Sequence, residues 1–192
     1  MLPIGPLMIE HRLIERMIVL MRSELTRIKD NVAVDPEFAF VDPLFLDTAV
    51  DFIRTYADRC HHGKEEDILF AALAGKELSP EHRRTMEELI QEHVWARQTT
   101  ASLVQAKESY LLEKPGALSE LLQHLEQLVE FYPRHIDKED QHFFIPCMAY
   151  CRDAEKAEML RRMMEFDQKQ IHEKYRGVVE GIEQRKGCKT CK

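Results

Sequence analysis

The sequence contains little glycine or proline and no apolar run long enough to cross a membrane. Only 7 of its 192 residues are glycine and 8 are proline, which is typical of helical globular proteins rather than of disordered or all-β chains. No stretch approaches the roughly 18 consecutive apolar residues of a membrane span. The N-terminal stretch MLPIGPLMIEHRLIER carries charged residues early and lacks the apolar core of a secretory signal. We therefore expect no membrane association and a cytoplasmic location.

An excess of positive charge and a disulfide framework are also missing. The formal net charge is −7 at pH 7, which argues against binding to nucleic acid. Five cysteines are an odd number, and without an export signal they argue against paired disulfides. Cys188 and Cys191 form a CxxC pair, but a zinc site would need two further ligands. We expect residues 185–192 to be a flexible tail without a metal of its own.

What the sequence does contain is a helical spacing of apolar residues. Apolar positions recur every three or four residues, and cap and stop signals divide the pattern into five segments. Asp42-Pro43 and Ser79-Pro80 each combine an N-cap residue with proline at the first helical position. The segment 30–41 lacks the periodicity and is predicted to be a loop. The predicted helices span about 7–29, 43–74, 80–113, 117–150 and 153–184.

Short connections between helices of similar length favour antiparallel neighbours. We therefore predict an all-α fold, an antiparallel up-down four-helix bundle with an additional C-terminal helix, in one domain over residues 5–184. Pro133 falls inside the fourth predicted helix, where it removes one backbone hydrogen bond. We expect a local kink there, just before His135.

Histidines and carboxylates lie on the apolar faces of these helices. In the fourth helix, leucines at positions 118, 121, 125 and 128 mark the buried face, and the same face then presents His135 and Glu139. Residues four apart lie on one side of a helix, about 6 Å apart along its axis. Burying such polar groups is unfavourable unless a partner compensates. A shared metal cation would be such a partner.

The second predicted helix carries two overlapping pairs with the same spacing, His61/Glu65 and His62/Glu66. The first pair shares its face with apolar residues at positions 50, 53 and 57, whereas the second shares a more polar face with two threonines and an arginine. The local sequence His-His-Gly-Lys-Glu-Glu also aligns with His-Ile-Asp-Lys-Glu-Asp around the later pair. We favour His61/Glu65, with His62/Glu66 as the alternative.

His11 and His93 lie on the apolar faces of the first and third predicted helices. His11 lies about 18 residues before the end of the first predicted helix, and His61 lies about 18 residues after the start of the second. The corresponding distances for His93 and His135, counted from the ends of their helices, are also similar. In antiparallel helices with equal rise per residue, the four histidines reach one height. Imidazole nitrogen with carboxylate oxygen suits iron, manganese or zinc. Two carboxylates that can bridge favour two ions.

At these positions the sequence resembles the hemerythrin-like (HHE cation-binding) family. The family pattern H…HxxxE…H…HxxxE is met here, and flanking text such as IEHRLIER, HHGKEEDILF, EHVWAR and HIDKEDQHFFIP is also similar over roughly residues 5–150. The resemblance implies a four-helix bundle with two non-haem iron ions, bridged by two glutamates and by an oxo, hydroxo or water ligand. The matching positions are His11, His61, Glu65, His93, His135 and Glu139.

The sequence departs from the oxygen-carrying members of that family. Arg97 stands where they have a second histidine on the third helix, and the position of their aspartate is taken by Asp140, although Glu139 has the better helical spacing. Six protein ligands would leave an open position. His172 on the fifth helix lies beside an apolar stripe and has two interpretations, a seventh metal ligand or a residue that supports the ligands.

The resemblance implies several functions. The first is binding or reacting with oxygen, nitric oxide or peroxide, in sensing, storage or stress response. The alternative is an enzyme that reduces nitric oxide or peroxide, or supplies iron for the repair of iron–sulfur clusters. A third is a structural bundle whose histidines hold zinc or no metal. Tyr132, one turn before His135, either packs in the core or donates a hydrogen bond to a bound small molecule. A protein partner or electron donor is not identified.

Overall fold

The computed structural model describes residues 2–35, 39–167 and 170–187, and this part of the chain is helical with no strand. Two long helices are continuous, α1 (Ile4–Val34) and α4 (Pro80–Leu111). Two further rods consist of consecutive helical segments. The first comprises α2 (Pro43–Phe52), η2 (Ile53–His62), η3 (Glu65–Phe70) and α3 (Ala71–Ala74); the second comprises α5 (Ala117–Asp137), η4 (Lys138–Phe143), α6 (Phe144–Cys147) and η5 (Met148–Tyr150). The chain continues into α7 (Asp153–Phe166) and α8 (Gln170–Lys186).

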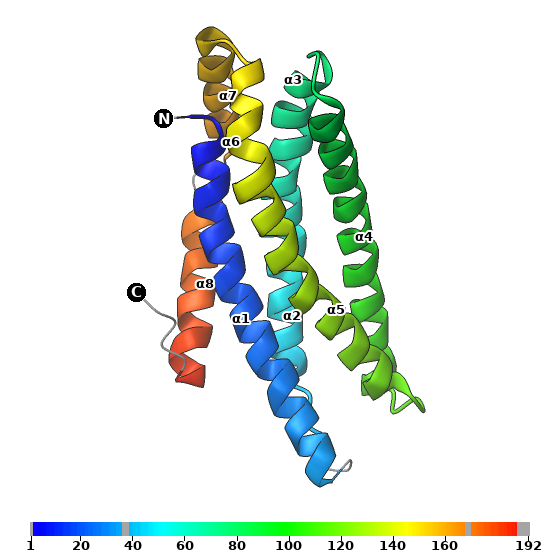
Figure 1. Ribbon diagram of the computed structural model, residues 1–192. Coiled ribbons are helices and arrows are strands. Elements are labelled where there is room, and N and C mark those ends of the chain that lie inside the picture. The colour runs from blue at the N-terminus through cyan, green and yellow to red at the C-terminus, as the bar shows by residue number, and fades with distance from the viewer. Residues whose placement is uncertain (1, 36–38, 168–169, 188–192) are drawn as a thin grey trace.

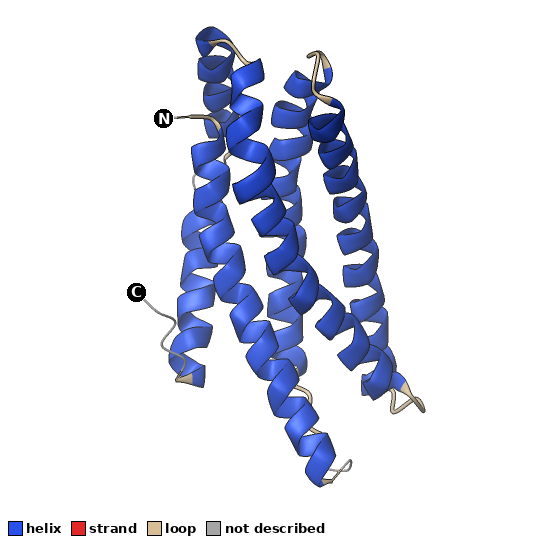
Figure 2. Cartoon of the chain, in the orientation of Figure 1, coloured by secondary structure: helices blue, strands red, loops and turns tan. Residues whose placement is uncertain are grey.

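The four rods run antiparallel and pack in a ring. Figure 1 shows the chain descending through α1, returning through α2 and α3, descending through α4 and returning through α5 and α6. In the ring, α1 contacts α5, α5 contacts α4, and η2 contacts both α4 and α1. Short loops join the rods (Figure 2). This confirms the predicted all-α up-down bundle, with additional C-terminal helices beside it. Within the described residues, no helix is long and apolar enough to cross a membrane.

The helix starts follow the predicted caps. The Asp42 side chain accepts hydrogen bonds from the backbone nitrogens of Leu44 and Phe45, and the Ser79 hydroxyl accepts one from His82. Such caps satisfy backbone donors that lack a partner within the helix. They mark where the second and third rods begin.

The interior contains two hydrophobic clusters separated by a polar layer. One cluster involves α1, α2, α5 and α8, and the other gathers near the opposite end of the rods, where α7 covers η3. On α1, His11 lies between Leu7 of one cluster and Ile14 of the other. His61 and His93 likewise lie between residues of the two clusters on their own rods, and His135 lies at the edge of the first cluster, before Phe143 of the second. The four histidines therefore share one level of the bundle.

The fifth predicted helix is wrong as a single element, because the structure divides it into α7 and α8. Met159 and Met163 are buried on α7, whereas Tyr175, Val179 and Ile182 are buried on α8. Twelve residues separate Met163 from Tyr175, so a straight helix would place them about 120° apart around its axis. The break at Asp167 lets both apolar stripes face the bundle. Cys188 and Cys191 of the predicted tail lie outside the described residues.

Pro133 does not end α5, which continues to Asp137. Proline lacks the N–H that would bond to the carbonyl four residues earlier. That carbonyl, on Val129, instead accepts a hydrogen bond from the Arg22 guanidinium at 2.9 Å. The irregular stretch begins after His135 rather than before it, at the wider turns of η4.

Candidate metal centre

Four histidines and two glutamates converge in the polar layer. Each of the six side chains is at most 2 % exposed. They come from all four rods, so residues far apart in the sequence meet at one point. These residues are His11, His61, Glu65, His93, His135 and Glu139, which are the six positions that the family pattern matches.

The two oxygens of Glu65 face different histidines. Oε1 lies 3.3 Å from His61 Nε2, and Oε2 lies 3.4 Å from His93 Nε2. Two ligand atoms at right angles on one metal, each at about 2.0–2.2 Å from it, lie about 3 Å apart. The spacing at each oxygen is close to that value. Glu65 can therefore contribute one oxygen to each of two metal positions.

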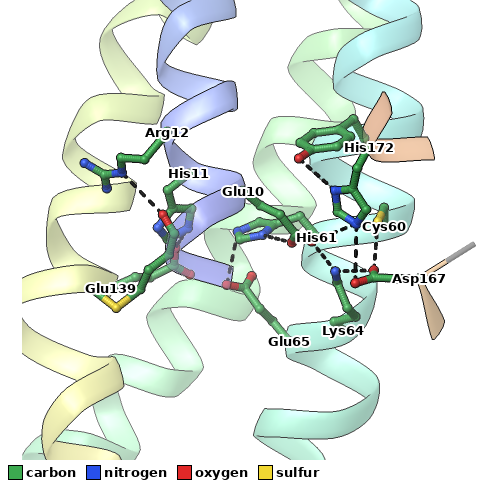
Figure 3. A network of polar contacts seen from close by, with 12 residues as sticks. Glu10, His11, Arg12, Cys60, His61, Lys64, Glu65, Glu139, Asp167 and His172 are labelled. Atoms are coloured by element: carbon green, nitrogen blue, oxygen red, sulfur yellow. Dashed lines mark hydrogen bonds and ion pairs between the residues drawn. The ribbon is translucent and has the colours of Figure 1, made fainter. Parts of the chain in front are cut away.

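Glu139 is arranged in the same way from the opposite rod. Its Oε2 lies 3.2 Å from His11 Nε2, and its Oε1 lies 3.3 Å from His135 Nε2 and 3.8 Å from His93 Nε2. Figure 3 shows Glu65 and Glu139 approaching the layer from separate rods, with His11 and His61 between them. The two carboxylates thus define two neighbouring positions, one beside His11 and His61 and one beside His93 and His135.

The atoms at the centre have no hydrogen-bond partner among the described residues. This holds for the Nε2 atom of all four histidines and for both carboxylate oxygens of Glu65 and Glu139. Buried polar atoms are nearly always satisfied, and a buried carboxylate without a partner is costly. Metal ions bound between these atoms would satisfy all of them. The donor set therefore fits metal binding.

A carboxylate supports each imidazole from outside the centre. Each of the four histidines is paired through Nδ1 with a carboxylate oxygen at 2.7–2.9 Å. A proton on Nδ1 leaves the Nε2 lone pair free to bind a metal, and such outer partners also fix the ring orientation. The pairs are His11 with Asp140, His61 with Glu10, His93 with Glu66, and His135 with Glu92.

The electrostatics of the centre favour positive charge. Burial opposes a charged imidazole, yet the carboxylates of Glu65 and Glu10 outweigh burial and raise the pKa of His61 to about 10. Burial likewise opposes ionisation of Glu139, but the surrounding histidines hold its pKa well below the usual range. The carboxylates of Glu10 and Glu139, whose pKa values are both lowered, stay ionised in the interior and favour a cation beside them.

Comparison with known families gives one match. The model of the hemerythrin HHE cation binding domain matches residues 2–145, which include all six converging residues. The chain belongs to the hemerythrin HHE cation-binding family. Comparisons with curated proteins and with solved structures found no match. Family membership and the groups of buried histidines and carboxylates identify a metal-binding protein.

This hemerythrin-like domain buries one histidine that the sequence argument set aside. His62 is 1 % exposed, although helical periodicity had placed it on a polar face. Its ring stacks on His93 with 3.8 Å between centroids, and a nitrogen of His62 lies within 4.8 Å of nitrogens of His93 and His135. The cause is local: η2 is a π-helix, whose wider turns let consecutive residues face inward. Glu66, its predicted partner, instead supports His93.

His172 is not brought to the four histidines. Its Nδ1 lies 3.1 Å from the Tyr56 hydroxyl, and its Nε2 lies 3.4 Å from Glu10 and 3.3 Å from Asp167. Lys64 forms ion pairs with the same two carboxylates, which Figure 3 shows beside His172. His172 therefore lies one layer out from the centre, where Glu10 connects it to His61.

The sequence differs from the oxygen-carrying members at Arg97 and Asp140, and in the structure both side chains pair with residues outside the group of six. Arg97 forms ion pairs with Asp58 and Glu66, both at 2.7 Å. Asp140 pairs with the outer nitrogen of His11 and with Arg12 rather than facing the centre. The geometry therefore favours Glu139 over Asp140 as the inward carboxylate, as the helical spacing had indicated.

Proposed function

We propose that this domain binds two non-haem iron ions in the polar layer of the bundle. The first ion would be held by His11 and His61, and the second by His93 and His135. Glu65 and Glu139 would bridge the two ions through their separate oxygens. The proposal rests on one observation: each buried carboxylate faces a histidine nitrogen of both groups, and none of these atoms has a protein hydrogen-bond partner.

The chemistry of the donors supports iron. Imidazole nitrogen and carboxylate oxygen without thiolate suit iron, manganese or zinc, and iron is the metal that the family resemblance implies. Zinc and manganese are the alternatives that metal analysis must separate. A bridging oxo, hydroxo or water ligand would complete the pair of ions. His62 lies beside the second group and is a candidate additional ligand there.

The activity that fits this centre is binding or reacting with a small molecule, namely oxygen, nitric oxide or peroxide, in sensing, storage or stress response. Iron would supply reversible binding of the molecule or electron transfer to it. The protein contributes burial, because both bridging carboxylates are fully shielded from solvent, and fixed imidazole orientation through the outer carboxylates. Enzymatic turnover would also need an electron donor. The cytoplasmic location stays a prediction.

Metal content of substituted proteins tests the proposal. His61→Ala and His135→Ala each remove one of the converging nitrogens, so we expect both to lose most of their iron, measured per protein after anaerobic purification. His124→Ala is the matched control, because the His124 ring hydrogen-bonds to Gln127 on its own helix and is not among the converging residues. After oxidation in air, which converts bound iron to the ferric state, the wild-type protein should show near-ultraviolet oxo-to-iron absorption. Equal iron content in all three folded variants would overturn the assignment.

A further inference from the structure

A second group of side chains that can bind metal lies just outside the polar layer, where Glu10 contacts His61. Four parts of the fold contribute one side chain each, namely α1, η2, the break after α7, and α8. One nitrogen, sulfur or oxygen atom of each side chain lies within 4.8 Å of those of the other three. We call this group the outer cluster, and Figure 3 shows it around Lys64. Its members are Glu10, Cys60, Asp167 and His172.

The spacing within the outer cluster matches a tetrahedral zinc site. Zinc binds nitrogen and oxygen at about 2.0–2.2 Å and sulfur at about 2.3 Å, so neighbouring ligand atoms in a tetrahedron lie about 3.3–3.7 Å apart. His172 Nε2 lies 3.4 Å from Glu10 Oε1 and 3.3 Å from Asp167 Oδ2. Cys60 Sγ lies 3.6 Å from the other oxygen of Asp167. Three contacts between members of the cluster therefore have the expected spacing.

The donor atoms are also those that zinc binds. Imidazole nitrogen, cysteine sulfur and carboxylate oxygen are all zinc ligands, and the sulfur distinguishes this cluster from the histidines and glutamates of the polar layer. Burial raises the pKa of the Cys60 thiol to about 12, so the thiol keeps its proton when no metal is bound. Coordination to zinc would release this proton to the solvent, leaving the thiolate on the metal.

Lys64 supplies the positive charge that now lies beside these carboxylates. Its buried ammonium forms ion pairs with Glu10 and Asp167. Buried carboxylates need such a partner, so this part of the interior already holds a cation. One ammonium, however, balances only one of the two carboxylates. An ion pair with lysine also gives no role to the thiol and the imidazole beside it, whereas a zinc ion would use all four side chains.

A cavity of about 400 Å³ between α1, η2 and α8 leads to the outer cluster. Glu10, Asp167 and His172 line it, and the side chains of Asp167 and His172 are 18 % and 28 % exposed. Three arginines also line the cavity, and two of them are neutralised by ion pairs with carboxylates. A metal ion can therefore reach the ligand atoms from solvent without unfolding of the bundle.

We propose that the outer cluster binds one zinc ion through Glu10, Cys60, Asp167 and His172, in competition with the Lys64 ammonium. This site is separate from the proposed iron centre and does not depend on which ions occupy the polar layer. Glu10 would bind zinc through Oε1 while its Oε2 stays paired with His61. Because the ligands come from α1, η2 and the two C-terminal helices, bound zinc would fasten these helices to the bundle and raise its thermal stability.

Zinc titration of the iron-loaded protein against a chromophoric chelator tests this site. The wild-type protein should bind one zinc ion per chain. Cys60→Ser and His172→Ala each remove a ligand, so affinity should fall by more than the roughly 10- to 100-fold lost with a supporting partner. Lys64→Met removes a competing positive charge and should strengthen zinc binding by about tenfold or more. Iron content is measured in the same samples.

Cys147→Ser and His124→Ala are the matched controls, because neither residue belongs to the outer cluster. Equal zinc affinity in Cys60→Ser, His172→Ala and the controls would overturn the site. Loss of zinc binding with iron retained in wild type concerns this inference alone, whereas zinc binding without any iron contradicts only the proposed function.

Crystals of the zinc-loaded protein, measured on both sides of the zinc absorption edge, decide the position of the ion. An anomalous peak among the four side chains, absent from Cys60→Ser, supports the outer site. A peak confined to the polar layer, or one that persists unchanged in Cys60→Ser, would overturn it. Since Lys64→Met weakens a buried ion pair, a failure of that variant to fold leaves the decision to Cys60→Ser and His172→Ala.

Discussion

Two halves of the polar layer use the same arrangement of side chains. In one half, Glu10 of α1 accepts hydrogen bonds from an inward histidine and from Lys64; in the other, Glu92 of α4 does the same with Lys138. Each glutamate directly precedes a histidine of the centre, and each lysine directly precedes one of the two converging glutamates, Glu65 or Glu139. The motif repeated in the sequence therefore produces a repeated set of contacts.

The two halves differ in what covers them. The Lys64 side chain is 0 % exposed and forms a second ion pair with Asp167, whereas the Lys138 side chain is 29 % exposed and reaches Glu88. Asp167 comes from the break between α7 and α8, a segment beyond residues 2–145 of the family match. The repeated sequence motif therefore determines the hydrogen bonds of Glu10 and Glu92. The helices α7 and α8 determine how deeply the half that contains Glu10 is buried. The glutamate–lysine ion pair should therefore contribute more to the free energy of unfolding in the buried half than in the exposed half.

Removing the two lysines in turn should give the largest difference. Lys64→Ala removes the lysine partner of the buried Glu10 carboxylate and of the partly buried Asp167 carboxylate, which should lower the free energy of unfolding by about 3 kcal/mol. Lys138→Ala acts on a partly exposed pair and should lower it by about 1 kcal/mol or less. Urea denaturation at matched iron content measures both values. Equal losses would mean that α7 and α8 do not set the energetics of the covered half.

Neutralising the outer glutamates should affect metal affinity next. Glu10→Gln and Glu92→Gln each weaken the support of one imidazole, and loss of such a partner costs about 10- to 100-fold in metal affinity. We expect the larger loss for Glu10→Gln, because it also removes a counter-charge of buried Lys64. Competition with a chelator gives the two affinities. A larger effect of Glu92→Gln would reverse the comparison.

A further effect on stability concerns how α8 is held against α1. Glu24 is 2 % exposed and pairs with Arg27 at 2.7 Å and with Lys186 of α8 at 2.6 Å. Burial alone would raise the pKa of Glu24, but the hydrogen bonds from Arg27 and Lys186 outweigh it and lower the pKa. Glu24→Gln should therefore reduce the free energy of unfolding by about 1.5 kcal/mol at pH 7.

The pH dependence of that loss follows from the direction of the shift. Because the folded protein favours the ionised carboxylate, Glu24 contributes its full stability above the unfolded-state pKa of about 4.3. The contribution disappears as the pH falls through the lower folded-state pKa. The difference between wild type and Glu24→Gln should shrink over that acidic range, as measured by denaturation at several pH values. A difference that stays constant to the lowest pH would contradict this role.

The four rods and the six converging residues could be predicted because their signals are local. Residues four apart on an α-helix share a face, so His135 and Glu139 follow the apolar stripe directly. His62 could not be placed in this way, since the π-helical turns of η2 rotate it inward against the expected period. The repeated Glu-His step at Glu10 and Glu92 is a signal that could have identified the outer carboxylates.

The surroundings of His172 depend on tertiary structure that periodicity does not encode. A continuous fifth helix would carry His172 along one stripe, but the break after Phe166 reorients α8 and brings Asp167 and His172 over Glu10. In one continuous helix, the apolar residues of α7 and α8 would lie on different faces. This shift in the apolar pattern is the signal from which the break between the two helices could have been predicted. The ion pair between Asp167 and Lys64 depends on packing between segments that are far apart in the sequence.

Diffraction at the iron absorption edge from crystals of the iron-loaded protein tests the central claim most directly. If Glu65 and Glu139 bridge two ions, two anomalous peaks should lie between these carboxylates, about 3.5–4 Å apart. One peak should lie beside His11 and His61, and the other beside His93 and His135. A single peak would contradict the account. So would iron found only at the neighbouring group of possible ligands, which comprises Glu10, Cys60, Asp167 and His172.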